Sequence, residues 1–348
     1  MHREPTRKGS LVTLTDGTLT EADARKMFEG MRWPNGPVCT FNDCGGSEIY
    51  RIKVAGKTLK SGRVVGPREL FKCKACRRQF SVTKGTAFED SKIPLRTWLV
   101  VMYRMCSSKK SVSARQIERE FGMSHRAAWF MCHRIRWMMT DKNPRKLSGN
   151  LEADETYVGG KLRGHAKKRA AHNLAMTGDT RARSLKDAYA RKTPVFGIRE
   201  RDGNIRAQVM PKVSQDNVER AMWRAVDREN ARLFTDEHPV YANMIKMLPH
   251  DVIRHKSEYV RGEIHTQGIE SFWAILKRGL VGTYHHVDAG YLAQYVNEYE
   301  FRHNSRKISD AERFQLLASQ TSGRLDWYLG QQASQRVASE PDRREDLI

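Results

Sequence analysis

The sequence lacks the long apolar runs that would place the chain in a membrane. No stretch approaches the roughly 20 consecutive apolar residues that a membrane-spanning helix needs. The opening residues, Met1–Pro5, lack the apolar core of a secretory signal. Cysteine is also scarce, with six residues, and four of these form two close pairs, which inside a cell favours metal binding over disulfides. We therefore expect a soluble intracellular protein.

Acidic residues are too few to balance the basic ones. The 348 residues include 62 lysines and arginines against 40 aspartates and glutamates, which gives a formal net charge of +22. Such an excess suits a polyanionic partner, because each phosphate that is neutralised releases condensed counterions. The alternative is a basic surface that is merely solvated. We predict that the chain binds nucleic acid.

The chain is long enough for two or three domains, and its 39% hydrophobic residues can form real cores. Shifts in composition and Pro- or Gly-containing stretches mark the expected boundaries. They predict a polar N-terminal segment (1–32), a cysteine-rich ribbon (33–90), a helical domain (91–142), a linker (143–150), a larger domain (151–305) with a basic insertion (161–192), and a C-terminal tail (306–348).

Strand and helix patterns predict a mixed sheet flanked by helices, an α+β or α/β fold, for residues 151–305. A short strand at 151–154 precedes a hairpin around Asp202–Gly203, then a helix that Ser214 begins, then a strand at 231–236. Helices are expected around 269–277 and 291–301. This order favours a sheet flanked by helices.

The four paired cysteines predict a structural zinc site. Cys39-x4-Cys44 and Cys73-x2-Cys76 supply four thiolates from two knuckles, and the segments at 49–54 and 69–71 alternate as the strands of a zinc ribbon would. A domain of this size has too small a core to stand alone, so a metal would supply folding energy. The alternative is that the four cysteines are incidental.

The segment after the ribbon predicts three helices, the last two arranged as a helix-turn-helix. Pro94 suits a first helical position, Ser113 and Ser124 are cap residues, and Gly122 is a stop signal between them. The last helix is expected to expose a basic surface toward DNA, although any helical hairpin has this punctuation. That surface comprises His125, Arg126, His133, Arg134 and Arg136.

Three carboxylates occupy positions suited to metal binding. Asp154 and Asp236 each end a short apolar strand, and Glu270 lies on a helix whose apolar side includes Ile269 and Trp273. Strands hold carboxylates rigidly at sheet ends, and such oxygens are ligands for hard cations. Singly, each residue has a simpler interpretation: Asp236 as a helix cap, and Glu270 as a surface partner of a lysine seven positions later, Lys277. Together, in so basic a chain, they predict phosphodiester chemistry.

Four motifs resemble those of the ISXO2-like insertion-sequence transposases, members of the DDE class. Residues 73–86 read CKACRRQFSVTKGT, residues 152–161 read EADETYVGGK, residues 265–279 read HTQGIESFWAILKRG with GTYHH at 282–286, and residues 298–304 read EYEFRHN. The resemblance covers about residues 35–305. The first cysteine knuckle departs from it, since a two-residue spacer is usual in the family.

The resemblance implies a zinc ribbon, a helix-turn-helix-like helical domain and an RNase H-like catalytic domain. It maps the catalytic set onto Asp154, Asp236, Glu270 and Lys277, with two Mg²⁺ (or Mn²⁺) ions per active site on the three carboxylates and zinc on the four cysteines. It also implies cleavage at the ends of a mobile element and transfer of the freed 3′-hydroxyl to target DNA. We expect a homo-oligomer on DNA, in the cytoplasm of a prokaryote at the nucleoid. The expected DNA contacts are Arg126, Arg134, Lys277 and Arg278.

Two other functions remain open at this point. One is a DNA-binding regulator that keeps the ribbon and the helix-turn-helix but has an inactive catalytic domain. The other is an RNase H-like nuclease that cuts a structured nucleic acid without strand transfer. The presence of all three carboxylates together with Lys277 favours the transposase.

Overall fold

The computed structural model describes residues 19–58, 60–62, 64–65, 68–159, 192–253 and 265–323. The basic insertion expected at 161–192 lies, apart from its last residue, outside this part of the chain. The described residues divide into two compact units. One comprises residues 19–139 together with 307–323, and the other comprises residues 140–306.

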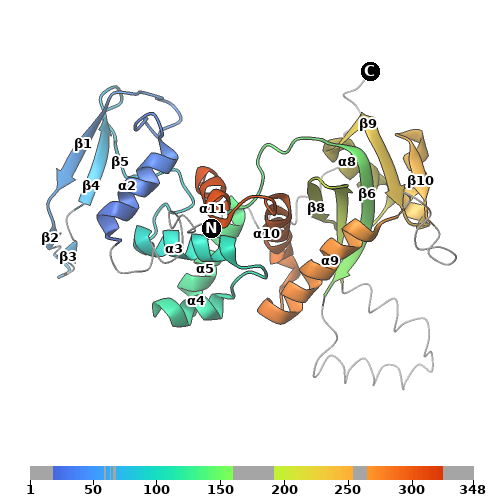
Figure 1. Ribbon diagram of the computed structural model, residues 1–348. Helices are drawn as coiled ribbons and strands as arrows, with labels where there is room; N and C mark the ends of the chain where they lie inside the picture. The colour runs from blue at the N-terminus through green and yellow to red at the C-terminus, as the bar shows by residue number, and fades with distance from the viewer. Residues whose placement is uncertain are drawn as a thin grey trace, which may run out of the picture. The chain divides into compact units, whose positions relative to one another are not determined.

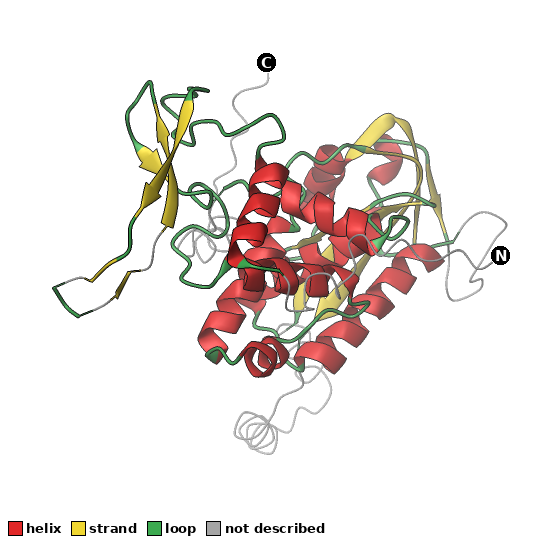
Figure 2. Cartoon of the chain, turned by 60° about the vertical axis from the view of Figure 1, so that its left-hand side comes forward, coloured by secondary structure: helices red, strands yellow, loops and turns green. Residues whose placement is uncertain are grey.

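The first unit opens with helix α2 (Glu21–Arg32) and a small sheet. Thr20 and Asp23 form a reciprocal capping box that starts the helix. Strands β1 (Ile49–Val54), β4 (Arg68–Cys73) and β5 (Gln79–Phe80) form an antiparallel sheet, and β2 (Lys57–Thr58) pairs with β3 (Val64–Val65) in the connection between β1 and β4 (Figure 2). The two ribbon strands predicted from alternation are confirmed.

Helices α3 (Leu95–Ser107), α4 (Ala114–Phe121) and α5 (His125–Met138) follow the ribbon. Pro94 is the N-cap of α3, and the hydroxyls of Ser113 and Ser124 accept backbone hydrogen bonds at the starts of α4 and α5. Gly122 ends α4 in the left-handed conformation, with φ +63°. The roles predicted for Ser113, Gly122 and Ser124 are therefore confirmed, whereas Pro94, expected at the first helical position, directly precedes it.

A further helix of this unit, α11 (Asp310–Ser319), lies in the stretch that the sequence analysis assigns to a C-terminal tail. Its Phe314 packs against Tyr103 of α3, with ring centroids 5.7 Å apart. Arg313 donates to the backbone carbonyl of Cys106, also in α3. These contacts make residues 310–319 part of the core of the first unit.

The second unit is built on a five-stranded sheet with the order β10-β9-β6-β7-β8 (Figure 1). Strands β6, β7 and β8 form an antiparallel meander, whereas β9 runs parallel to β6 and β10 parallel to β9. This mixed arrangement is that of RNase H-like folds, so the predicted α/β class is confirmed. The strands are β6 (Leu147–Val158), β7 (Thr193–Glu200), β8 (Ile205–Val209), β9 (Val226–Thr235) and β10 (His250–Val252).

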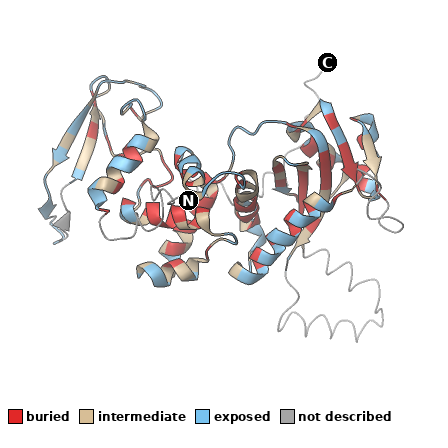
Figure 3. Cartoon of the chain, viewed as in Figure 1, coloured by how far each residue is buried: buried red, intermediate tan, exposed pale blue. Residues whose placement is uncertain are grey.

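Helices cover both faces of this sheet. Helix α8 (Gln215–Ala225) packs on one face through Met222, with Ala153 and Phe196 beneath it. Helices α9 (Gln267–Gly279) and α10 (Leu292–Asn304) pack on the other face. Figure 3 shows the resulting band of buried residues along the strands. Short helical turns occur at Pro239–Tyr241, Met244–Lys246, Leu280–Tyr284 and Ala289–Tyr291.

The free edge of β8 is closed by side chains of α10. A carboxylate oxygen of Glu300 accepts from the N–H of Ala207, and the Asn304 side chain both accepts from the N–H and donates to the C=O of Ile205. Unpaired edge groups would otherwise be a template for pairing with another chain.

Among the described helices, none has the length and apolar character to cross a membrane.

Candidate metal centre and active site

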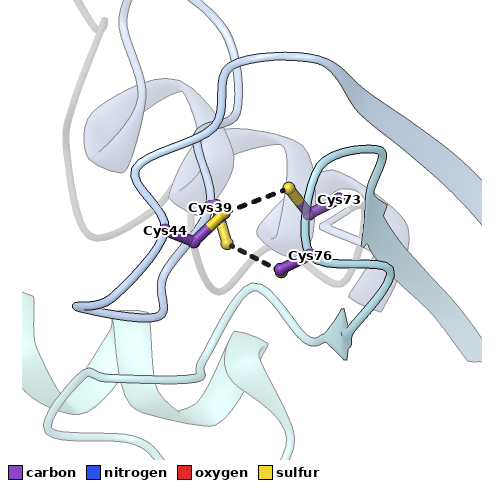
Figure 4. Close-up of side chains that lie close together, drawn as sticks. All are labelled: Cys39, Cys44, Cys73 and Cys76. Atoms are coloured by element: carbon purple, nitrogen blue, oxygen red, sulfur yellow. Dashed lines mark hydrogen bonds between the residues drawn. The ribbon is translucent and has the colours of Figure 1, made fainter.

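Four cysteine sulfur atoms gather where the ribbon's two knuckles meet (Figure 4). The Sγ atoms of Cys39 and Cys76 are 3.7 Å apart, those of Cys44 and Cys73 are 3.6 Å apart, and all four lie within 4.8 Å of one another. Sulfurs bound tetrahedrally to zinc at about 2.3 Å lie about 3.8 Å from each other. The four side chains therefore fit a closed zinc site, as the cysteine spacing predicts.

Local backbone geometry explains how the longer first knuckle reaches this arrangement. Gly45 has φ +62°, which turns the chain after Cys44. A Cβ on the next residue, Gly46, would lie 3.0 Å from the Sγ of Cys73. The four-residue spacer thus delivers its sulfurs because two consecutive glycines let the backbone turn and approach the second knuckle.

The thiols differ in how readily they ionise. The side chain and backbone N–H of Arg78 lower the pKa of Cys76 to about 6. Burial raises the pKa of the Cys39 thiol to about 12. Since zinc binds thiolates, a cation at this position would have to draw the proton from Cys39, whereas Cys76 is ready to ligate near neutral pH.

In the second unit, Asp154 and Asp236 occupy corresponding positions on two parallel strands. Glu152 of β6 pairs with Phe234 of β9. The same register, continued by two residues, sets Asp236 directly after the end of β9 beside Asp154. Side chains two residues apart point to the same face of a strand. The two carboxylates therefore lie side by side on one face of the sheet. Asp236 follows β9 directly, as expected, but the expectation that Asp154 ends its strand is wrong, because β6 continues to Val158.

Helix α9 is joined to β6 by a direct hydrogen bond to Asp154. The indole Nε1 of Trp273 donates to Oδ2 of Asp154 at 3.1 Å. Glu270 lies one turn earlier on the same helix and accepts from the hydroxyl of Thr266 at 2.8 Å. The helix therefore brings the third predicted carboxylate toward the first two.

The electrostatics of Asp154 report the approach of the other carboxylates. Its pKa is raised from 3.8 to about 7, first by burial and then by the charges of Glu155, Asp236 and Glu270. The oxygens of Asp154, Asp236 and Glu270 do not all lie within 4.8 Å of one another, however. In the described part of the chain, only the four cysteines form a group of three or more candidate ligands that all lie within 4.8 Å of one another. The carboxylates are neighbours, spaced more widely than the sulfurs.

Glu155 lies on the opposite face of β6 from Asp154, as strand alternation predicts. Its Oε2 accepts from the hydroxyl of Tyr241 at 2.5 Å, within the core beneath α8. Its Oε1 is 3.8 Å from Nε2 of His238, whose backbone N–H donates to Asp236. Glu155 therefore influences Asp154 through its charge while it is bound to the far side of the sheet.

The predicted DNA-contacting residues fall in different environments. Arg126, in the first turn of α5, is exposed, and so are Lys277 and Arg278 near the end of α9. Arg134 is partly buried and donates to the backbone carbonyl of Glu89 at 3.0 Å. Arg278 donates through Nε to the Ala274 carbonyl of its own helix.

The expectation that α5 exposes its whole set of basic side chains is wrong for two of them. His133 is fully buried, and Arg136 is 1% exposed. The buried positions of α5 include Met131, Cys132 and Ile135 as well, so they surround the middle of the helix. The apolar pattern of the sequence predicts that only one face of α5 is buried, whereas the helix is packed on more than one side.

Two residues that position the carboxylates have only a weak signal in the sequence. Gly197 pairs with Asp154 in the β6–β7 register, and a Cβ at Gly197 would lie 2.7 Å from the ring of Trp273. A glycine inside a strand marks a close approach, and this one receives the tryptophan of α9. Neither the glycine nor the tryptophan identifies its partner from sequence alone.

The comparisons with known proteins agree with this architecture. Residues 146–304 match the model of the ISXO2-like transposase domain, and residues 19–79 match that of a transposase zinc-ribbon domain, which takes in α2. A relative from Halobacterium salinarum is described as an uncharacterized protein in transposable element ISH50. It is 25% identical over 288 residues, which cover 82% of this chain and 91% of the relative.

The RNase H-like fold and the two domain matches define a transposase that carries a zinc ribbon. More narrowly, residues 146–304 match the ISXO2-like transposase domain, the family that the chain's motifs resemble.

Proposed function

We propose that this protein binds the ends of an insertion sequence, cleaves the DNA there with divalent cations, and joins the freed 3′ ends to target DNA. One observation carries the proposal. The parallel register of β6 and β9 sets Asp154, within β6, beside Asp236, directly after β9, and α9, which bears Glu270, is hydrogen-bonded to Asp154 through Trp273. In an ISXO2-like transposase domain, that arrangement supports the DDE assignment.

The donor set fits hard divalent cations. Carboxylate oxygens are the ligands that Mg²⁺ and Mn²⁺ prefer. The pKa of Asp154 is raised to about 7 partly because other carboxylates surround it, a repulsion that a bound cation would relieve. We assign two such ions to each active site, held by Asp154, Asp236 and Glu270. When bound, such a pair activates the attacking oxygen and stabilises the leaving oxygen of a phosphodiester.

The remaining groups orient the reactants. Trp273 fixes one carboxylate oxygen of Asp154, so the side chain cannot rotate freely during the reaction. Lys277 is exposed seven positions after Glu270, about two turns and 10 Å further along α9. Its ammonium, together with Arg278, would hold a DNA phosphate near the carboxylates, while water attacks first and a DNA 3′-oxygen attacks second.

The first unit would recognise the element ends. The zinc ribbon and the α4–α5 pair provide two DNA-contacting elements in one compact unit, with Arg126 exposed at the start of α5. Because both ends of an element must be held together, we propose at least a dimer on DNA. The site of action would be the nucleoid in a prokaryotic cytoplasm.

A plasmid assay separates this function from the two alternatives. Purified protein is incubated with Mg²⁺ and a plasmid that carries paired element ends, beside the Asp154→Ala variant. The transposase predicts joined products from the wild type, and loss of both cleavage and joining with end binding retained in the variant. Nicks without joined product would indicate a nuclease, and binding without cleavage would indicate a regulator. Strand transfer by Asp154→Ala would defeat the assignment of the site.

A further inference from the structure

We propose that Glu152 is a positioning residue of the active site, which fixes the start of helix α9, and with it Glu270, against the strand that carries Asp154. The inference rests on the proposed function, because it concerns the geometry of the same carboxylate set. Glu152 belongs to the EADET motif but has no role in the catalytic set described above.

Glu152 is completely buried and fully engaged. Its Oε2 accepts from the backbone N–H of Ile269 at 2.8 Å and from Nη1 of Arg199 at 3.4 Å. Its Oε1 accepts from Nε of Arg201 at 3.2 Å and lies 3.5 Å from Nδ1 of His265. Its side chain has 0% exposure, against 16% for Arg199 and 17% for Arg201. A carboxylate so enclosed is committed to these partners and is not available to a cation.

The hydrogen bond from the Ile269 N–H to Glu152 is made next to Glu270, so it can fix the position of that residue. Ile269 is the residue immediately before Glu270, in the first turn of α9. Glu152 stands two residues before Asp154 on the same face of β6. One carboxylate therefore joins the backbone beside the third predicted ligand to the strand that supplies the first.

The residues around the contact between Glu152 and the start of α9 are closely packed. A Cβ on Gly268 would lie 1.4 Å from Nη1 of Arg199 and 2.6 Å from Oε2 of Glu152, so any larger residue there would displace one or both of these groups. Arg201 also donates through Nη2 to the carbonyl of His265 at 3.0 Å, which fixes the residues just before the helix. We call Glu152, Arg199, Arg201 and Gly268 the α9 clasp.

If Glu152 had a purely structural role, its substitution would lower the stability of the fold and nothing more. A control must therefore be a buried glutamate whose loss affects stability alone. The same sheet supplies a matched control. Glu200 of β7 has a side chain that is 7% exposed, and it accepts from Arg145 and from the backbone N–H groups of Ser148 and Asn204. It is a buried, arginine-paired glutamate with no contact to α9 among its hydrogen bonds.

The test measures metal binding directly, on the full-length protein with its zinc retained. Mn²⁺ is titrated into the wild type, Glu152→Gln, Glu200→Gln and Asp154→Asn, and free Mn²⁺ is followed by electron paramagnetic resonance. Thermal unfolding and end-DNA binding are recorded for each variant. Gly268→Ala keeps the glutamate at position 152, but its Cβ would crowd Nη1 of Arg199 and Oε2 of Glu152. It tests the same clasp by a second route if Glu152→Gln folds poorly.

The inference predicts that Glu152→Gln and Gly268→Ala bind Mn²⁺ roughly 10-fold or more weakly than the wild type, because residues that orient metal ligands typically contribute that much. Glu200→Gln should bind Mn²⁺ as the wild type does, even where its unfolding temperature falls. Equal Mn²⁺ affinity in the wild type and both clasp variants would overturn the positioning role and leave the proposed function intact. Wild-type binding no stronger than that of Asp154→Asn would overturn the proposed metal site and this inference with it.

Discussion

The indole of Trp273 packs directly against the backbone of Gly197, where a Cβ would lie 2.7 Å from its Cζ2 and Cη2 atoms. Gly197 is also the β7 partner of Asp154, to which that indole donates its hydrogen bond. The glycine in one strand therefore allows α9 to approach the carboxylate in the next. This relationship connects sheet packing to the geometry of the proposed active site.

The first prediction concerns Gly197→Ala. The added methyl should push Trp273 away from Asp154, lower the stability by about 1–3 kcal/mol through overpacking, and reduce cleavage roughly 10- to 100-fold through misplacement of the carboxylate. Urea unfolding and cleavage of labelled end DNA measure the two effects. Gly282→Ala is the control, because a Cβ there meets nothing within 4 Å. Unchanged cleavage by Gly197→Ala would contradict the positioning of Asp154 by Trp273.

The second prediction concerns the ribbon. Metal analysis of the full-length protein should find about one zinc per chain, since one group of four cysteines fits a closed site. Cys73→Ser should lose most of that zinc and destabilise the first unit, because a small ribbon derives much of its folding energy from its metal. Cys132→Ser, at a buried cysteine in α5 outside the group, should keep its zinc. A zinc-free wild type that remains fully folded would refute the assignment.

The third prediction follows from the raised pKa of Asp154. The folded protein holds this proton up to about pH 7, because the pKa of Asp154 is raised to about 7 from its ordinary value of 3.8. The contribution of Asp154 to stability is therefore complete below about pH 4 and is lost as pH rises through about 7. Without Mg²⁺, the free energy of unfolding should fall by up to about 4 kcal/mol over this range on account of Asp154.

Urea unfolding at a series of pH values checks the third prediction. Asp154→Asn should flatten the decline and should be more stable than the wild type near neutral pH, because a neutral amide removes the repulsion from Glu155 and Asp236. Added Mg²⁺ should restore the stability of the wild type more than that of the variant. Parallel pH curves for the two proteins would show that Asp154 titrates normally.

The fourth prediction separates two arginines of α5. Arg126 is exposed, so Arg126→Ala should weaken binding of end DNA and reduce the slope of log affinity against log salt by about 1. Arg134 donates to the Glu89 carbonyl, so Arg134→Ala should mainly lower the unfolding temperature. Salt titrations of binding and thermal unfolding measure both. A larger change of salt slope for Arg134→Ala than for Arg126→Ala would reverse the assignment.

Features with a local signal were predictable from the sequence. Ser113, Gly122 and Ser124 act through hydrogen bonds or backbone conformation within a few residues, and the structure has the helix ends where they indicate. The cysteine spacing likewise predicted a sulfur cluster that the structure contains. The roles of Asp154, Asp236 and Glu270 remain proposals, although the structure brings the three toward one another on one face of the sheet.

Features that depend on distant contacts were not predictable. The α9 clasp joins Glu152 to residues 47 and 117 positions later in the chain, and no spacing rule connects them. The burial of His133 depends on packing around α5 that an apolar stripe does not encode. Helix α11 did carry a local signal, the capping box of Ser309 and Glu312, but its polar surroundings obscured it.

The central claim is that three carboxylates far apart in the chain act together on DNA. Its most direct test is cleavage of end-labelled element DNA by purified protein with Mg²⁺, beside Asp236→Asn at equal DNA occupancy. The account predicts Mg²⁺-dependent cleavage by the wild type and none by the variant, with equal affinity for the ends. Cleavage by Asp236→Asn at the wild-type rate would contradict it.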